Sequence, residues 1–168
     1  MLYEMTIPQF LKMLNNLNLI IEKAELFAVT KKVEMDVLLN SRLAADQFSL
    51  IRQIQIACDT AKLAAHRLTG KDVPNHADTE KTVSEIKERI TNTMAYLKTF
   101  NESDFIGSES KHISQPRWEG KYLTGSEFVQ QHVLPNFYFH MTTAYSILRH
   151  NGVEIGKKDY LGTMPYKK

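Results

Sequence analysis

Apolar residues recur at steps of three and four along four long stretches of the chain, which is the spacing of an amphipathic helix. The first stretch opens at a capping box formed by Thr6 and Gln9, with Pro8 in the first helical turn. The apolar positions that follow predict a helix of about six turns. They are Phe10, Leu14, Leu17, Ile21, Ala24 and Ala28.

The next long stretch predicts a helix from Phe48 to Thr69, and Gly70 supplies a left-handed residue that ends it. It carries an apolar stripe and, beside it, a polar stripe. The apolar stripe is Ile51, Ile54, Cys58, Ala61, Ala65 and Leu68, and the polar stripe is Arg52, Gln55, Asp59, Lys62 and His66. A third helix follows the N-cap residue Asp78 and turns its apolar face inward at Val83, Ile86, Ile90, Met94 and Leu97.

Helical periodicity is lost between Asn101 and Leu123, where two short runs beside Glu119-Gly120 predict a partly hairpin-like loop. The last helix then opens at a second capping box and runs to Asn151-Gly152. Pro135 lies inside it, so a kink or a break into two helices is expected there. Four long amphipathic helices predict an all-α fold, an up-and-down four-helix bundle forming one domain over residues 1–168.

Composition agrees with a folded globular protein and excludes several classes. Of the 168 residues, 43% are hydrophobic and 24% are charged, and the net charge of +2 lacks the basic stripe of a nucleic-acid binder. No run approaches the ~18 apolar residues of a membrane span, and residues 1–5 lack the features of a signal peptide. With Cys58 as the single cysteine, a reducing compartment is expected, so we predict a cytoplasmic protein.

Candidate chemistry lies on the last helix, where His132, Asn136 and His140 are spaced four residues apart. His140 is a candidate ligand or acid–base group, and also a candidate core histidine that bonds to a neighbouring helix. Pro135 is expected to turn His132 out of register, which favours a surface or loop position for it. No phosphate-binding glycine loop, CxxC pair or HExxH motif occurs.

Several long strings resemble a bacterial branch of the DinB/YfiT-like superfamily whose domain is of unknown function. They include RQIQIACDTAK at 52–62 and PNFYFH at 135–140, together with segments 39–44, 142–145, 147–153 and 157–162. The resemblance implies a four-helix bundle, a homodimer, and a divalent metal held by three histidines. One histidine would come from the second helix and two from an HxxxH pair on the last, serving hydrolase, isomerase or thiol-transferase chemistry.

This chain departs from that pattern at two of the three ligand positions. The last-helix pair is Asn136 and His140, and the second-helix position falls near Gln55 or Ile56, neither of which is a strong ligand. A divalent metal is therefore possible but not favoured, with His140 and His132 as its weak candidates.

Three functions follow from these residues. The leading one is a small-molecule-binding bundle with a degenerate metal site, whose pocket is lined by Gln55, Asp59, Asn136 and His140. The alternatives are a metal-dependent hydrolase or thiol transferase that uses His140 with Asp59 and Gln55, and a structural or interaction module whose polar stripe is solvated. We expect a homodimer and no nucleic-acid or membrane partner.

Overall fold

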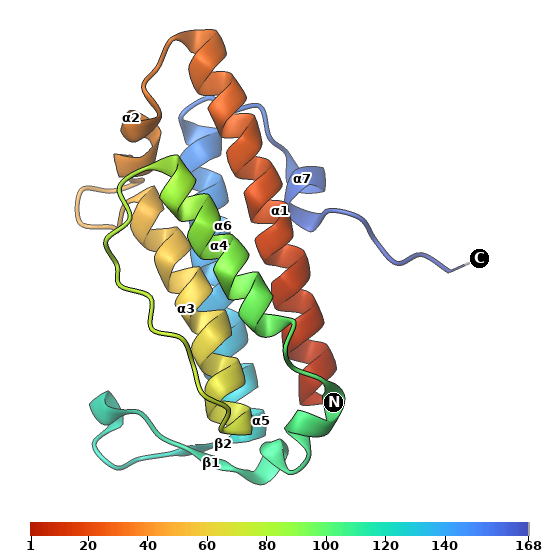
Figure 1. Ribbon diagram of the computed structural model, residues 1–168. Coiled ribbons are helices and arrows are strands. Elements are labelled where there is room, and N and C mark those ends of the chain that lie inside the picture. The colour runs from red at the N-terminus through yellow and green to blue at the C-terminus, as the bar shows by residue number, and fades with distance from the viewer. Residues whose placement is uncertain (168) are drawn as a thin grey trace.

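The structure is a computed structural model that describes residues 1–167. It is mostly helical, as the sequence predicts, and its four long helices lie side by side (Figure 1). These helices are α1 (Leu2–Lys31), α3 (Leu50–Thr69), α4 (Val83–Leu97) and α6 (Leu134–His150). Their apolar faces meet in one core, in which the rings of Phe10 and Phe137 lie 4.7 Å apart.

Short elements join the long helices and close the ends of the molecule. Helix α2 (Met35–Asn40) follows α1. Three short helices follow α4, namely η1 (Glu102–Phe105), η2 (Ser108–Ser110) and η3 (Pro116–Trp118). Strands β1 (His112–Ile113) and β2 (Leu123–Thr124) pair antiparallel, with His112 opposite Thr124. Helix α7 (Lys157–Leu161) follows α6 and packs on α1.

The last helical run is continuous rather than broken at Pro135. Helix α5 (Gly125–Glu127), the π-helix η4 (Phe128–Val133) and α6 follow one another without a gap. Pro135 lies in the first turn of α6 and cannot donate a backbone hydrogen bond, and the wider π turn directly before it accommodates the missing bond. Gly125 is required at the start, because a Cβ there would lie 1.8 Å from the Ser108 carbonyl oxygen.

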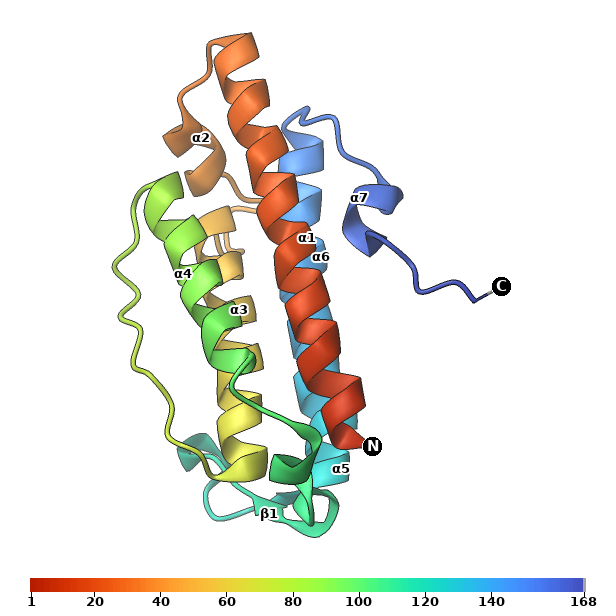
Figure 2. The same ribbon diagram turned by 45° about the vertical axis from the view of Figure 1, so that its right-hand side comes forward.

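The connection order differs from the predicted up-and-down bundle, because α3 and α4 run in the same direction. At one end, Lys71, just after α3, pairs with Asp104, just after α4, at 2.6 Å. At the other end, Arg52 in the first turn of α3 pairs with Asp78, just before α4. Segment 71–82 therefore runs back along the length of α3, and Figure 2 shows it on the outside of the helices.

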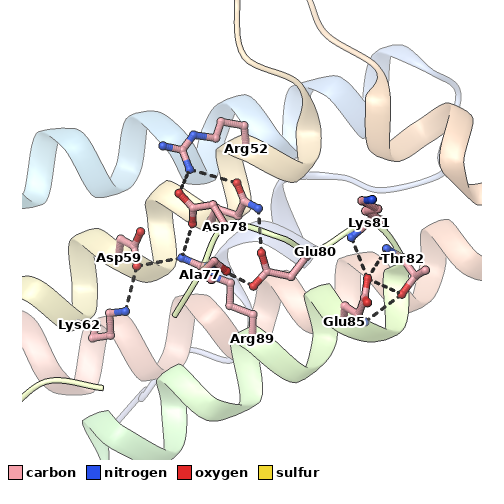
Figure 3. Close-up of polar contacts among 11 residues, drawn as sticks. Arg52, Asp59, Lys62, Ala77, Asp78, Glu80, Lys81, Thr82, Glu85 and Arg89 are labelled. Carbon is pink, nitrogen blue, oxygen red and sulfur yellow. Dashed lines mark hydrogen bonds and ion pairs between the residues drawn. The ribbon is translucent and has the colours of Figure 1, made fainter. Parts of the chain in front are cut away.

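This return segment is held by Arg89 of α4, whose side chain is only 1% exposed. Its guanidinium contacts a carboxylate oxygen of Asp59 at 2.9 Å, of Asp78 at 3.0 Å and of Glu80 at 2.9 Å (Figure 3). It also donates a hydrogen bond to the Ala77 carbonyl. One buried cation therefore joins α3, α4 and the return segment.

Two further cations and an amide complete the cluster around Arg89. Lys62 pairs with Asp59 at 3.1 Å, Arg52 pairs with Asp78, and Gln55 donates to Glu80 at 2.8 Å. The three carboxylates thus meet three cations, so the buried charges are balanced. The polar stripe of α3 is consequently directed at α4 and segment 71–82.

Asp78 and Glu80 of this cluster have lowered carboxyl pKa values. Burial by itself would raise the pKa of Asp78, but the hydrogen bond and charge of Arg52 and the charge of Arg89 outweigh it, so its pKa is lowered. Burial likewise opposes ionisation of Glu80, and the bond from Arg89 lowers its pKa overall. A carboxyl group whose pKa is lowered by folding adds to the free energy of unfolding at pH values above its unfolded-state pKa. This contribution is lost as the pH falls through the folded-state pKa.

Within residues 1–167, no helix has the length and apolar composition needed to cross a membrane.

We predict that Arg89→Met lowers the free energy of unfolding by about 2–3 kcal/mol at pH 7, because it leaves three partly buried carboxylates without their shared cation. Urea unfolding measures this loss. The matched control is Lys87→Met. The Lys87 side chain is 32% exposed, against 1% for Arg89, so its loss should cost less than about 1 kcal/mol. The Arg89 penalty should shrink as the pH falls below about 4 and through the lowered folded-state pKa values of Asp78 and Glu80, where these carboxylates become protonated. Equal losses in the two variants would contradict the role of Arg89.

Candidate functional site

A cleft of about 490 Å³ opens between α3 and α6 and is covered at one end by residues 115–117. Its volume lies in the range of small-molecule sites. The polar lining residues are Asp59, Thr60, Arg67, Gln115, Arg117, His132, Asn136 and His140. The apolar ones are Phe48, Ile56, Leu63, Pro116, Phe128 and Val133.

A larger groove of about 720 Å³ lies between α1 and the C-terminal segment. Its described lining contains no histidine, and two of its charged residues, Lys23 and Asp159, pair with each other at 2.6 Å. The cleft between α3 and α6 is therefore the better candidate for a functional site, because it combines histidines, unpaired cations and an apolar wall.

His140 is buried in the wall of the cleft and is oriented by Gln53 of α3. The Gln53 side-chain amide donates to the Phe48 carbonyl at 3.0 Å, so its carbonyl oxygen is directed at His140 Nδ1, 2.7 Å away. Nδ1 must therefore carry the proton, and Nε2 is left as an acceptor. Among residues 1–167, Nε2 forms no hydrogen bond, so it is the atom that a ligand would meet.

The surroundings of His140 keep it neutral. Burial is the main cause that lowers the pKa of His140, and the charge of Arg52 lowers it further, to about 4. The unfolded-state pKa is about 6.5. Between about pH 6.5 and 4, the imidazole therefore binds a proton in the unfolded chain but not in the folded chain. The free energy of unfolding consequently decreases as the pH falls through this range.

Asn136 lies one turn before His140 and bonds across the cleft. Its amide nitrogen donates to the Thr60 hydroxyl at 2.7 Å, and that hydroxyl donates to the Ile56 carbonyl at 2.7 Å. Both Asn136 and Thr60 are thus fixed by neighbouring helices. The amide nitrogen of Asn136 is engaged as a donor, so a metal could meet only its carbonyl oxygen, a neutral ligand weaker than imidazole.

His132 also lines this cleft, in place of the surface or loop position expected from Pro135. The uninterrupted helical run through η4 keeps it on the same side as Asn136. Its Nε2 is 2.7 Å from an Arg117 nitrogen and accepts its hydrogen bond. The ring is stacked on Phe128 and contacts the edge of Trp118, at centroid distances of 5.5 and 5.7 Å.

The structure brings together three of the four residues of the predicted pocket and directs the fourth, Gln55, elsewhere. Asp59, Asn136 and His140 line the cleft, although one Asp59 oxygen already pairs with Lys62 and Arg89. Gln55 does not line it, because its side chain extends to Glu80 on the other side of α3. The face of α3 opposite His140 and Asn136 instead carries Gln53, Ile56 and Thr60.

Sequence reasoning missed Gln53, Thr60, Arg67 and Arg117. Gln53 and four cleft residues of α3 lie on one face of the helix, because they are spaced three and four residues apart. They are Gln53, Ile56, Thr60, Leu63 and Arg67. This stripe alternates polar with apolar residues, so a search for purely polar or purely apolar stripes passes over it. Arg117 lies in the loop that lacks periodicity and had no signal in the pattern.

The residues of the cleft do not fit the three-histidine metal site of the superfamily. Residues 1–167 contain no group of three or more His, Cys, Asp and Glu side chains placed to hold a metal. Among the described residues, His140 supplies one imidazole nitrogen that forms no hydrogen bond. Asn136 offers only an amide oxygen, which is a weaker ligand, and His132 Nε2 accepts a hydrogen bond from Arg117. The positive charges of nearby arginines act on both histidines, which further disfavours binding of a metal cation there.

Comparison with known proteins agrees with this fold. Residues 2–161 match a domain of unknown function, DUF1993. A crystal structure of a DinB family member protein from Shewanella denitrificans is 64% identical, with a TM-score of 0.98, and the match covers 100% of this chain and 96% of that one. No curated protein matches the chain significantly.

These findings define a DinB-like helical protein. Within that class, the chain belongs to the DUF1993 family, since the family model spans nearly all of it. The resemblance read from the sequence is confirmed.

We predict that NMR titration of the imidazole of His140 gives a pKa of about 4 and, at pH 7, a spectrum with the proton on Nδ1. The reason is burial together with the Gln53 carbonyl, which accepts only from a protonated Nδ1. The signal is assigned by its loss in His140→Gln. Gln53→Leu should mix the two tautomers. A pKa near 6.5 or a proton on Nε2 in the wild type would contradict the assignment.

Proposed function

We propose that this protein binds a small molecule in the cleft between α3 and α6 and that the metal site of its superfamily is degenerate in it. The observation that carries the proposal is His140, a neutral histidine whose Nδ1 is fixed by Gln53 and whose Nε2 is left free beside an apolar wall. An oriented acceptor in a concave, mostly apolar site is typical of small-molecule recognition.

Binding is favoured over catalysis by the groups around the cleft. Burial raises the pKa of the Cys58 thiol to about 12, so this cysteine does not supply a nucleophilic thiolate. His140, with its pKa of about 4, is a weak base at neutral pH. No carboxylate hydrogen-bonds to it in the described part of the chain, as an activated dyad would require.

The metal-dependent alternative is supported less well. It requires Gln55 and Asp59 as oxygen ligands beside His140, and these side chains are engaged by Glu80, Lys62 and Arg89. Ile56 stands in the cleft where the second-helix histidine is expected. The lost ligands are thus replaced by groups that shape a pocket.

We further propose a DinB-type four-helix bundle in which α3 and α4 are parallel, forming a single domain. Homodimer formation and a cytoplasmic location stay predictions, the first of which sedimentation velocity tests.

Metal analysis of natively purified protein tests the degenerate site. We predict well under one equivalent of zinc or nickel in the wild type. The variant Ile56→His with Asn136→His restores the ligand pattern of the superfamily and should bind zinc at least about tenfold more tightly, because imidazole is a stronger ligand than an amide or an alkyl group. Stoichiometric metal in the wild type that is lost in His140→Ala would overturn the proposal.

An uncharged fluorescent probe, N-phenyl-1-naphthylamine, tests the cleft itself. We predict saturable binding that Leu63→Phe weakens at least about fivefold, because the larger ring fills part of the apolar wall. Leu19→Phe on α1, whose leucine is 51% exposed, is the matched control and should leave binding unchanged. A probe affinity that responds equally to both substitutions would show that this cleft is not the site.

A further inference from the structure

Two arginines without an acidic partner face the cleft at the end remote from Gln53. Arg67 lies near the C-terminal end of α3, and Arg117 lies in η3, which covers the cleft. Among residues 1–167, neither guanidinium pairs with a carboxylate, whereas Arg52 and Arg89 both do. Their charges are therefore available to something that the chain does not itself supply.

The two charges also act on each other. Partial burial lowers the pKa of Arg67, and the charge of Arg117 lowers it further, without a compensating carboxylate. Arg67 is half-buried, whereas Arg117 is exposed. Two like charges that line the same cleft repel each other, and an anion placed between them converts the repulsion into attraction.

Arg117 is positioned by a neutral partner instead of a charged one. It donates to His132 Nε2 at 2.7 Å, and the His132 ring is held against Phe128 and Trp118. Burial and the two arginine charges lower the pKa of His132, so this histidine stays neutral. The arrangement fixes the direction of Arg117 and leaves its charge uncompensated.

The single carboxylate that lines the cleft does not neutralise this end. Asp59 pairs with Lys62 and with Arg89 behind the α3 face. The charges that act on the two cleft histidines are those of arginines: Arg117 and Arg67 on His132, and Arg52 on His140. The potential in the cleft is consequently positive.

We propose that the ligand of this cleft is a small organic anion, with its carboxylate or phosphate between Arg67 and Arg117 and its apolar body along Ile56, Leu63 and Val133. This inference rests on the proposed ligand-binding function and names its ligand class. His132 and His140 are eight residues apart, or ~12 Å along the helix. A ligand with an uncharged donor at its far end therefore reaches His140 Nε2.

The test compares 8-anilinonaphthalene-1-sulfonate with N-phenyl-1-naphthylamine, which has the same rings without the anionic group. We expect Arg67→Gln and Arg117→Gln each to weaken the sulfonate about tenfold and to change the uncharged probe less than about twofold. Arg149→Gln, an exposed arginine at the other end of α6, is the control and should change neither. Added salt should weaken only the anionic probe.

The outcomes separate this inference from the proposed function. In one outcome, Leu63→Phe weakens binding of both probes while the glutamine variants of Arg67 and Arg117 change the affinity of the anionic probe no more than Arg149→Gln does. That result would contradict the proposed anion site and leave the proposed ligand-binding cleft supported. If neither probe responds to Leu63→Phe, both proposals fail. The double variant Arg67→Lys/Arg117→Lys keeps the charges and should retain the preference for the anion, which guards against a loss of folding in the glutamine variants.

Displacement of the bound sulfonate distinguishes the head group. Octanoate and octyl phosphate should both displace it more effectively than 1-octanol, and the more effective of the two identifies the carboxylate or the phosphate as the preferred anion. Equal displacement by 1-octanol would overturn the proposal.

Discussion

The interaction on which the rest of the structure depends is that of buried Arg89 with the carboxylates of Asp59, Asp78 and Glu80. Because α3 and α4 run in the same direction, the chain between them must return along about 30 Å of helix, and such a segment buries little apolar surface of its own. Arg89 fixes it by charge to both helices. With α4 held on one side of α3, the other side faces α6, and the cleft forms there.

The two faces of α3 thus have different chemistry. Toward α4, each carboxylate meets a cation and the charges balance, which suits a permanent structural contact. Toward α6, His140 is neutral and oriented by Gln53, while Arg67 and Arg117 have no acidic partner in the described residues. Half-buried Arg67, exposed Arg117 and the oriented His140 gather in one concave region, which supports a ligand site there.

The sequence predicted the parts of this structure that depend on local patterning. Helical periodicity located the four long helices, and the residues at 52–62 and 135–140 carried the resemblance to DinB-like proteins that the comparisons confirm. The parallel order of α3 and α4 was missed because helix patterns carry no direction. Gln55 was placed toward α6 because Glu80, the carboxylate that holds its side chain on the α4 side, lies in segment 71–82, outside the helices. Asp59 does line the cleft, although Lys62 and Arg89 engage one of its oxygens. Gln53 and Thr60 were overlooked since their stripe mixes polar and apolar residues, and Arg117 since it lies in a loop without periodicity.

The most direct test of the central claim, that the cleft between α3 and α6 is an organic-anion site and not a metal centre, is a crystal structure of the protein grown with octyl phosphate and zinc together. The account predicts the phosphate between Arg67 and Arg117, the alkyl chain along Leu63, and no metal on His140. A zinc ion bound by His140, or an octyl phosphate bound only outside this cleft, would contradict it.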